Sequence, residues 1–134
     1  MRPHRTFFLL ITVVLVLDTL SLAHHRTPSY DPSRSKTIEG QLVVLTLQNP
    51  HVFMLLDVPS SNGQDQKAQR WSIEWLNLGR LAEYGINKDN TIFRVGDRLR
   101  ITGFPDKLAE RELQASTIIR LADNWTWTLK SRPK

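Results

Sequence analysis

The chain has 134 residues, a hydrophobic fraction of 40% and a formal net charge of +5, and it contains no cysteine. This length accommodates one domain, and the lack of cysteine excludes a disulfide framework, thiol catalysis and thiolate metal sites. The basic excess is milder than the dense lysine clusters of dedicated nucleic-acid-binding proteins. A small domain without disulfides must be held together by its hydrophobic core, which favours a closed β-barrel.

The start of the chain has the pattern of a secretory signal peptide. Arg2 and Arg5 form a positive segment, residues 7–17 are apolar, and small side chains stand at positions 21 and 23. The apolar segment is shorter than the ~20 residues that a membrane span needs. We therefore expect cleavage after Ala23, a periplasmic or secreted location and no stable membrane span afterwards. The alternative is an uncleaved anchor.

Four segments follow from this interpretation. Residues 24–35 are rich in proline and serine and almost devoid of apolar side chains, which is typical of a flexible arm. We divide the chain into a signal peptide (1–23), a flexible N-terminal arm (24–35), an OB-like β-barrel domain (36–129) and a disordered tail (130–134).

Two apolar strands, predicted over 37–48 and 52–58, flank an Asn-Pro-His corner. Pro50 has a fixed φ and no N–H, and it restricts the residue before it to extended conformations, so the first strand ends there. His51 is thereby placed in the corner. Gly40, inside the first strand, indicates a bulge or a tight bend. Apolar residues on both faces of this strand indicate that it is buried on both sides for part of its length.

The later elements complete a barrel pattern. An Asn-Gly pair predicts a hairpin into a third strand, whose Trp-Ser-Ile-Glu-Trp run alternates in hydrophobicity. Asn77 is predicted to cap a helix that ends at Gly85. Trp125 and Trp127 alternate beyond the last predicted strand, where they either extend it or plug one end of the barrel. The predicted elements after the corner are strand 71–76, helix 78–84, strand 98–103 and strand 112–121.

Three strands, a short helix and two further strands form the layout of an OB-type barrel. We therefore predict an all-β protein with one short helix, folded as a five-stranded OB-like Greek-key barrel. An SH3-like or split barrel is the alternative.

Several short motifs occur along the chain in a fixed order. They are His24-His25, Tyr30-Asp31, Thr37-Ile38-Glu39-Gly40, Asn49-Pro50-His51, Leu56-Asp57-Val58, Trp71-Ser72-Ile73-Glu74, Val95-Gly96-Asp97 and Ile101-Thr102-Gly103. Together they resemble a family of small secreted bacterial proteins of unknown function, most specifically at the His-His start and the Asn-Pro-His corner. The resemblance covers nearly the whole mature chain and departs from the family at 75–79. It implies export to the periplasm and an OB-like barrel, and it supplies no activity.

The histidines suggest a metal site. After cleavage, His24 offers a free amine and a ring nitrogen as a chelating pair, and His51 supplies an opposing imidazole, with His25 as an auxiliary ligand. Such a nitrogen-rich tetragonal site suits Cu(II), and Zn(II) or Ni(II) are alternatives. In the simpler interpretation, the terminal pair is disordered and His51 is a turn residue bonded to the backbone.

A second hypothesis is a non-metal interaction module. Arg98 and Arg100 are expected on the outer face of one strand near Trp71, where they would bind a partner protein or polymer in the barrel groove. OB barrels bind single strands by pairing a positive groove with aromatic stacking. The alternative is a solvated basic surface over core tryptophans. Because an exported protein meets little nucleic acid, we do not expect nucleic acid as a partner.

No motif in the sequence indicates an enzyme. A nucleophile elbow, a phosphate-binding loop and an HExxH segment are all missing. Asp57, Glu74 and His51 are the only candidate acid–base residues on the first three strands. His51 and Asp57 would lie about 20 Å apart along an extended strand, which is too far for a dyad. We therefore do not expect catalysis.

Overall fold

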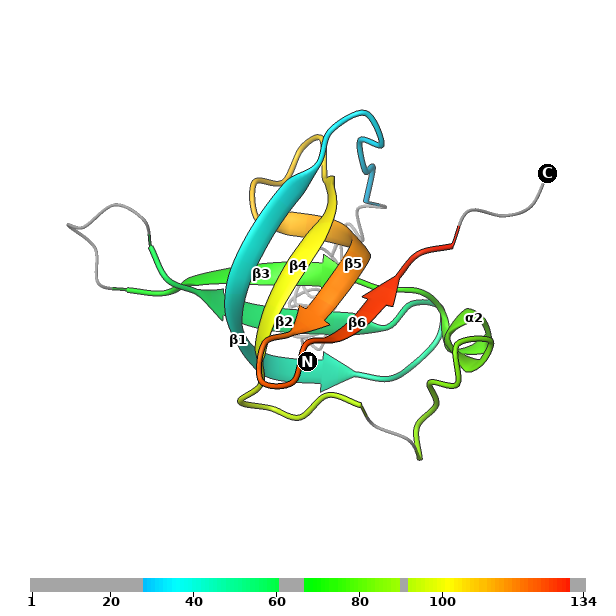
Figure 1. The fold of residues 1–134 in the computed structure, drawn as a ribbon. Coiled ribbons are helices and arrows are strands. Elements are labelled where there is room, and N and C mark those ends of the chain that lie inside the picture. The colour runs from blue at the N-terminus through cyan, green and yellow to red at the C-terminus, as the bar shows by residue number, and fades with distance from the viewer. Residues whose placement is uncertain (1–27, 61–66, 90–91, 131–134) are drawn as a thin grey trace, which may run out of the picture.

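A computed structural model describes residues 28–60, 67–89 and 92–130. The predicted signal peptide, His24, His25 and the Asn62-Gly63 turn lie outside these ranges, as do residues 131–134 of the predicted tail. The elements in the described ranges are β1 (Lys36–Thr46), β2 (Phe53–Val58), β3 (Gln69–Glu74), α2 (Leu78–Ala82), β4 (Arg98–Pro105), β5 (Glu112–Arg120) and β6 (Trp125–Thr128) (Figure 1). No helix within these ranges is long and apolar enough to cross a membrane.

Five strands close into the predicted OB-like Greek-key barrel, which is confirmed. β1 pairs with β2 and β4, β2 pairs with β3, and β4 pairs with β5, all antiparallel. A parallel pairing of β3 with β5, over Ser72–Glu74, closes the barrel. Helix α2 lies between β3 and β4 in the chain, as predicted, and the Asn77 side chain caps it by accepting a hydrogen bond from the Arg80 N–H at 2.9 Å. The helix is shorter than the predicted range 78–84.

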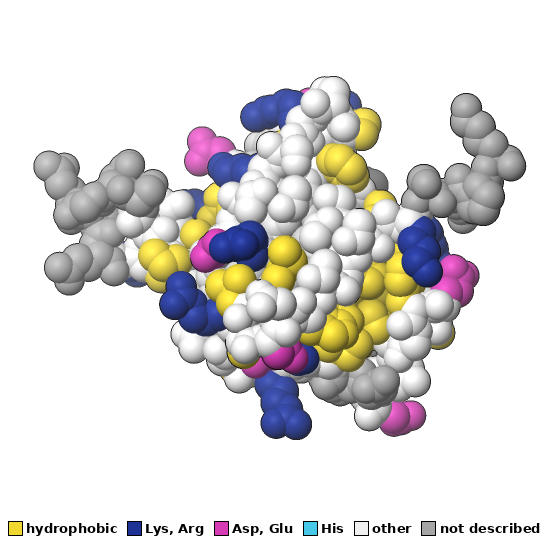
Figure 2. All heavy atoms as spheres, viewed as in Figure 1, with side chains coloured by type: hydrophobic (Ala, Val, Ile, Leu, Met, Phe, Trp, Pro, Cys, Tyr) yellow, Lys and Arg dark blue, Asp and Glu magenta, His cyan; other side chains and the backbone are white. Residues whose placement is uncertain are grey.

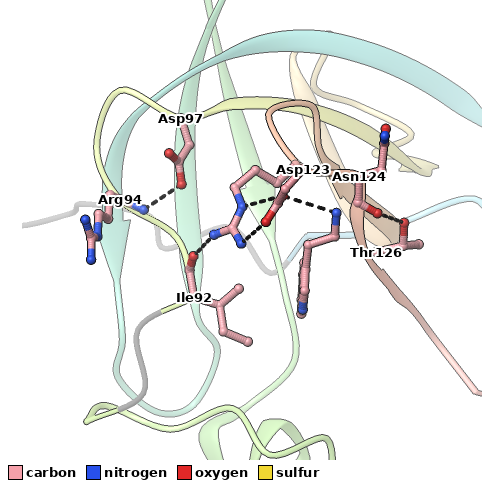
Figure 3. A network of polar contacts seen from close by, with 8 residues as sticks. Ile92, Arg94, Asp97, Asp123, Asn124 and Thr126 are labelled. Atoms are coloured by element: carbon pink, nitrogen blue, oxygen red, sulfur yellow. Dashed lines mark hydrogen bonds and ion pairs between the residues drawn. The ribbon is translucent and has the colours of Figure 1, made fainter.

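A sixth strand, β6, was not predicted. It pairs with β5 in antiparallel register, so residues 125–128 turn back along the sheet and do not continue β5. Asn124, with φ of 58°, provides the left-handed turn position between the two strands. The Arg120 guanidinium holds the turn by binding both oxygens of Asp123, at 2.9 and 2.8 Å, and by donating to the carbonyl of Ile92 (Figure 3).

The two Trp residues of β6 belong to an aromatic cluster. The Trp127 ring packs edge-on against Trp75 and Tyr84, with ring centroids 5.3 and 5.5 Å apart. Phe93 contacts Trp75 at 5.6 Å and Trp125 at 5.2 Å. Edge-to-face pairs at these distances add to the stabilisation that burial alone provides. The cluster therefore joins β6, the end of β3 and the segment before β4 into one core.

A bulge in β1 accounts for its apolar residues on both faces. Leu42 pairs with Leu56 of β2, but Val44 pairs with Leu55, so Val43 is an extra residue in the ladder. A bulge shifts the alternation by one position, and accordingly Leu42 is fully buried whereas Val44 is 40% exposed. The apolar residues on both faces therefore do not require β1 to be buried on both sides, as the sequence had suggested. Gly40, which the sequence suggested as the bulge, instead lies where the β2 backbone comes very close.

Candidate functional site

The Asn-Pro-His corner between β1 and β2 is tied to the end of β3 and to helix α2. The Asn49 side-chain oxygen accepts a hydrogen bond from the Leu78 N–H at 3.1 Å, at the start of the helix. Val52 exchanges two backbone hydrogen bonds with the segment after β3, donating to Leu76 and accepting from Trp75. These contacts fix the backbone on both sides of His51, whose side chain is 46% exposed.

His51 contacts a buried carboxylate. Its Nδ1 lies 2.6 Å from Oε1 of Glu74, whose side chain is only 4% exposed. The other oxygen of Glu74, Oε2, accepts a hydrogen bond from the Tyr30 hydroxyl at 3.0 Å. Glu74 ends β3, and strand alternation turns its side chain away from the barrel interior occupied by Ile73. The carboxylate is therefore buried on the outside of the barrel, between His51 and Tyr30.

The protonation states of this triad follow from its chemistry. Burial, and then the neighbouring Glu74, raise the pKa of the Tyr30 phenol far above its usual range, so Tyr30 keeps its proton and donates it to the carboxylate. A carboxylate accepts hydrogen bonds and does not donate them, so the carboxylate form of Glu74 requires a hydrogen on Nδ1 of His51. In the neutral ring the lone pair then belongs to Nε2, which can bind a metal or exchange a proton.

The Tyr30 side chain reaches Glu74 because the segment before β1 is docked on the barrel. Asp106, which is 5% exposed, accepts a hydrogen bond from the Ser29 N–H at 2.6 Å. Its other oxygen accepts from the N–H groups of Leu108 and Ala109. Tyr30 and Asp106 also form an antiparallel bridge, made by hydrogen bonds from the Asp31 N–H to the Pro105 carbonyl and from the Lys107 N–H to the Ser29 carbonyl.

This docking corrects the prediction of a flexible arm for residues 29–31. The arm has almost no apolar side chains, and the sequence therefore offered no reason for it to pack. Its attachment depends on a hydrogen bond from the Ser29 N–H to the buried side chain of Asp106, and on backbone hydrogen bonds with Pro105 and Lys107. Asp106 lies in a polar loop, where an acidic residue gives no sequence signal. Tyr30 and Asp106 are thus the site residues that the sequence analysis missed. The one signal in the sequence was the aromatic ring of Tyr30 in an otherwise polar arm.

The three predicted acid–base residues separate into two groups. His51 and Glu74 meet directly, whereas Asp57 forms a two-pronged ion pair with Arg70, at 2.8 and 3.0 Å. Among residues 28–60, 67–89 and 92–130, no three His, Cys, Asp or Glu side chains are grouped so that they could hold a metal ion. His24 and His25 lie outside these ranges.

The predicted groove of Trp71, Arg98 and Arg100 does not form one surface. Trp71 is 5% exposed and belongs to the core, with the Lys36 ammonium 4.5 Å above its ring. Arg98 and Arg100 are exposed on β4, and Arg100 pairs with Glu39 at 2.5 Å. Figure 2 shows basic side chains scattered among acidic and neutral ones over the visible face, with no single positive groove. A stacking platform on Trp71 is therefore excluded.

Comparison with known proteins gives few relatives. No curated protein matches the chain. Among solved structures, it is similar to the mitochondrial single-stranded DNA-binding protein Rim1 of S. cerevisiae, with 12% sequence identity and a TM-score of 0.47, over 69% of this chain and 95% of Rim1. This match corrects our expectation that nucleic acid is not a partner, because the similar structure is that of a single-stranded DNA-binding protein. At this identity and TM-score the match assigns no ligand to the present chain.

The sequence itself identifies the family. Residues 13–114 match a family of unknown function, DUF6152, and this range includes Tyr30, His51, Glu74 and Asp106. The match covers more than half of the chain and confirms the resemblance to a family of unknown function that the short motifs indicated. The chain therefore belongs to the DUF6152 family.

Proposed function

We propose that the chain is an exported binding module that holds a divalent metal ion, Cu(II) in the first place, at its Asn-Pro-His corner. The observation that carries this proposal is the 2.6 Å contact between Nδ1 of His51 and the buried carboxylate of Glu74. A histidine that binds a metal almost always donates its other ring N–H to a carboxylate, a carbonyl or water, which fixes the ring and raises its basicity. His51 has such a partner, and its Nε2 is left for the metal.

The remaining ligands would come from the start of the mature chain. Cleavage after Ala23 would free the amine of His24, which would chelate together with its own ring, and His25 would support it. The Tyr30 side chain is bonded to the same carboxylate as His51. Because an extended chain spans ~3.3–3.6 Å per residue, His24 lies at most ~20 Å along the chain from Tyr30. This short connection to a residue docked beside His51 supports the proposal that the start of the mature chain supplies the other ligands.

The donor set favours Cu(II) over Cu(I). The chain has no cysteine, and Met54 is fully buried in the core. The described residues therefore offer neither a thiolate nor an accessible thioether, which are the soft ligands that select Cu(I). Imidazole and amine nitrogens suit Cu(II), and they also accept Zn(II) or Ni(II). We place the module in the periplasm as part of the same proposal, since only removal of the signal peptide creates the terminal chelating pair.

Titration of residues 24–134 with Cu(II), followed by electron paramagnetic resonance, tests this function. Two changed chains accompany it: one with a single alanine added before His24, and His51→Ala. Gln48→Ala, an exposed neighbour of the corner, is the matched surface control. We expect sub-micromolar binding with a nitrogen-rich tetragonal signal, weakened or altered in the extended chain and in His51→Ala but not in Gln48→Ala. Equally weak binding in all four proteins would refute the proposal.

A further inference from the structure

We infer that Tyr30 is a positioning residue for His51, and that docking of the arm is coupled through Glu74 to whatever occupies Nε2 of His51. This inference rests on the proposed function where the occupant is a metal. The arm contacts the barrel in two ways: by its backbone, at Ser29 and Asp31, and by the Tyr30 hydroxyl on Glu74. Undocking of the backbone would therefore also remove the second donor from the buried carboxylate.

Glu74 can couple Tyr30 to His51 because each of these two residues contacts one of its carboxylate oxygens. One oxygen binds His51 and the other binds Tyr30, and the side chain is 4% exposed. A buried carboxylate that loses one donor must be hydrated or rotate toward another donor, since a buried polar group without partners is costly. Each of these outcomes changes the acceptor that holds Nδ1 of His51. With Tyr30 in place, the ring is held in one orientation by the contact of its Nδ1 with Glu74.

We expect the fixed orientation of the His51 ring to raise its affinity for a metal ion. Replacing the outer partner of a metal-binding histidine typically lowers metal affinity 10–100-fold. Coupling between two binding events is reciprocal, so the metal must tighten arm docking by the same factor by which docking tightens metal binding. Residues 29–31 would then be most firmly docked when His51 is occupied.

Tyr30→Phe tests the inference, since it removes the hydroxyl and retains the ring. The chain offers a matched control in Tyr84→Phe, which removes a hydroxyl that accepts a hydrogen bond from the Lys130 N–H. We expect Tyr30→Phe to lower the affinity for Cu(II) about 10–100-fold, and Tyr84→Phe to leave it unchanged. With the diamagnetic Zn(II), hydrogen exchange at the Ser29 and Asp31 amides should slow in the wild type, and less so in Tyr30→Phe.

A metal-free measurement separates this inference from the proposed function. The ¹⁵N shifts of the His51 ring report which nitrogen carries the hydrogen. We expect the wild type to show the hydrogen on Nδ1, and Tyr30→Phe to show a changed distribution. If the wild type binds no metal but the ring shifts change in Tyr30→Phe, the proposed function fails and the coupling stands. If the ring shifts are the same in both proteins, or if the wild type binds the metal and Tyr30→Phe binds it with the same affinity, the coupling is overturned.

Discussion

The Glu74 carboxylate lies 2.6 Å from Nδ1 of His51 and is almost completely covered, although strand alternation assigns it to the outside of the barrel. His51 reaches it from the corner before β2, and Tyr30 reaches it from the docked arm. Three segments that are far apart in the sequence thus meet at one buried negative group. Such a group requires donors on both oxygens to be tolerated, and for this reason the site is the place where a small chemical change should have a large effect.

Glu74→Gln is the first such change. The glutamine has nearly the same shape, but its single carbonyl oxygen can accept from only one of the two donors, and its amide group then faces the other. We expect a loss of about 1–3 kcal/mol in the free energy of unfolding, from the donor that is left unpaired, and a 10–100-fold loss of metal affinity. Chemical denaturation and metal titration measure the two effects.

Glu39→Gln provides the comparison for that variant. It also removes a carboxylate that pairs with a cation, but the Glu39 side chain is 41% exposed and its partner Arg100 is 47% exposed. Exposed ion pairs contribute only ~0–1 kcal/mol, and this pair lies on the outer faces of β1 and β4, away from His51. Metal affinity should not change in Glu39→Gln. Equal behaviour of the two variants in both measurements would contradict the role assigned to Glu74.

Gly40→Ala probes the close approach of β1 and β2. A Cβ at this position would lie 2.7 Å from the carbonyl oxygen of Asp57 and 3.0 Å from a methyl group of Val58. Because a backbone oxygen cannot move aside as a side chain can, the strands must separate, and we expect a loss of about 1–3 kcal/mol. Thermal and urea denaturation would show it as a lower Tm and a lower midpoint.

Gly79→Ala is the matched control for this variant. A Cβ there would lie 3.5 Å from the Asn77 side chain, an ordinary contact, and the position is inside helix α2. Since alanine is favoured over glycine in helices by about 0.5–1 kcal/mol, we expect no loss of stability. A destabilisation as large as that of Gly40→Ala would show that adding a methyl group alone, and not the approach of β2, causes the effect.

Much of the barrel could be predicted because each strand carries its own local signal. Alternation marked β3 and β4, Pro50 ended the first strand, and Asn77 marked the start of α2; all three are local features of the chain. The bulge at Val43 was missed for the opposite reason, since a run of apolar residues has the same pattern with and without an extra residue. The short strand β6 follows a turn that contains no glycine or proline, and its pairing with β5 is therefore not visible in the sequence.

The candidate site was only half predictable. His51 stood out because it follows Asn-Pro in a corner between two apolar strands. Glu74 was assigned to the solvent side of β3, and that assignment is correct for the strand alone. Its second partner is Tyr30, whose position depends on hydrogen bonds that the backbone of the arm makes with the loop around Asp106. Hydrogen bonds between backbone segments carry no side-chain pattern, and a site that depends on them appears only in three dimensions.

Trp127→Ala tests whether β6 belongs to the core or only lies on it. The Trp127 side chain is 3% exposed and packs against Trp75 and Tyr84. Truncation of a large buried aromatic residue costs about 3–5 kcal/mol, and we expect a loss of that size in chemical denaturation. The neighbouring Thr126 is exposed on the same strand, and Thr126→Ala should change stability by no more than about 0.5 kcal/mol. A loss below about 1 kcal/mol in Trp127→Ala would mean that β6 is peripheral.

Asp123 should make the stability of the fold depend on pH in the acidic range. The Arg120 guanidinium, followed by the Trp125 N–H, lowers the pKa of this carboxyl from 3.8 to about 2. A carboxyl group whose pKa is lower in the folded state stabilises the fold above the unfolded value, and the contribution disappears as the pH falls through the folded value. The Tm of the wild type should therefore exceed that of Asp123→Asn at about pH 6, and the gap should narrow between about pH 4 and pH 2. In an Arg120→Met background, which lacks the partner, the same substitution should produce a smaller gap with less dependence on pH. A gap that is constant with pH in the wild-type background would show that Asp123 acts through its backbone contacts and not through its charge.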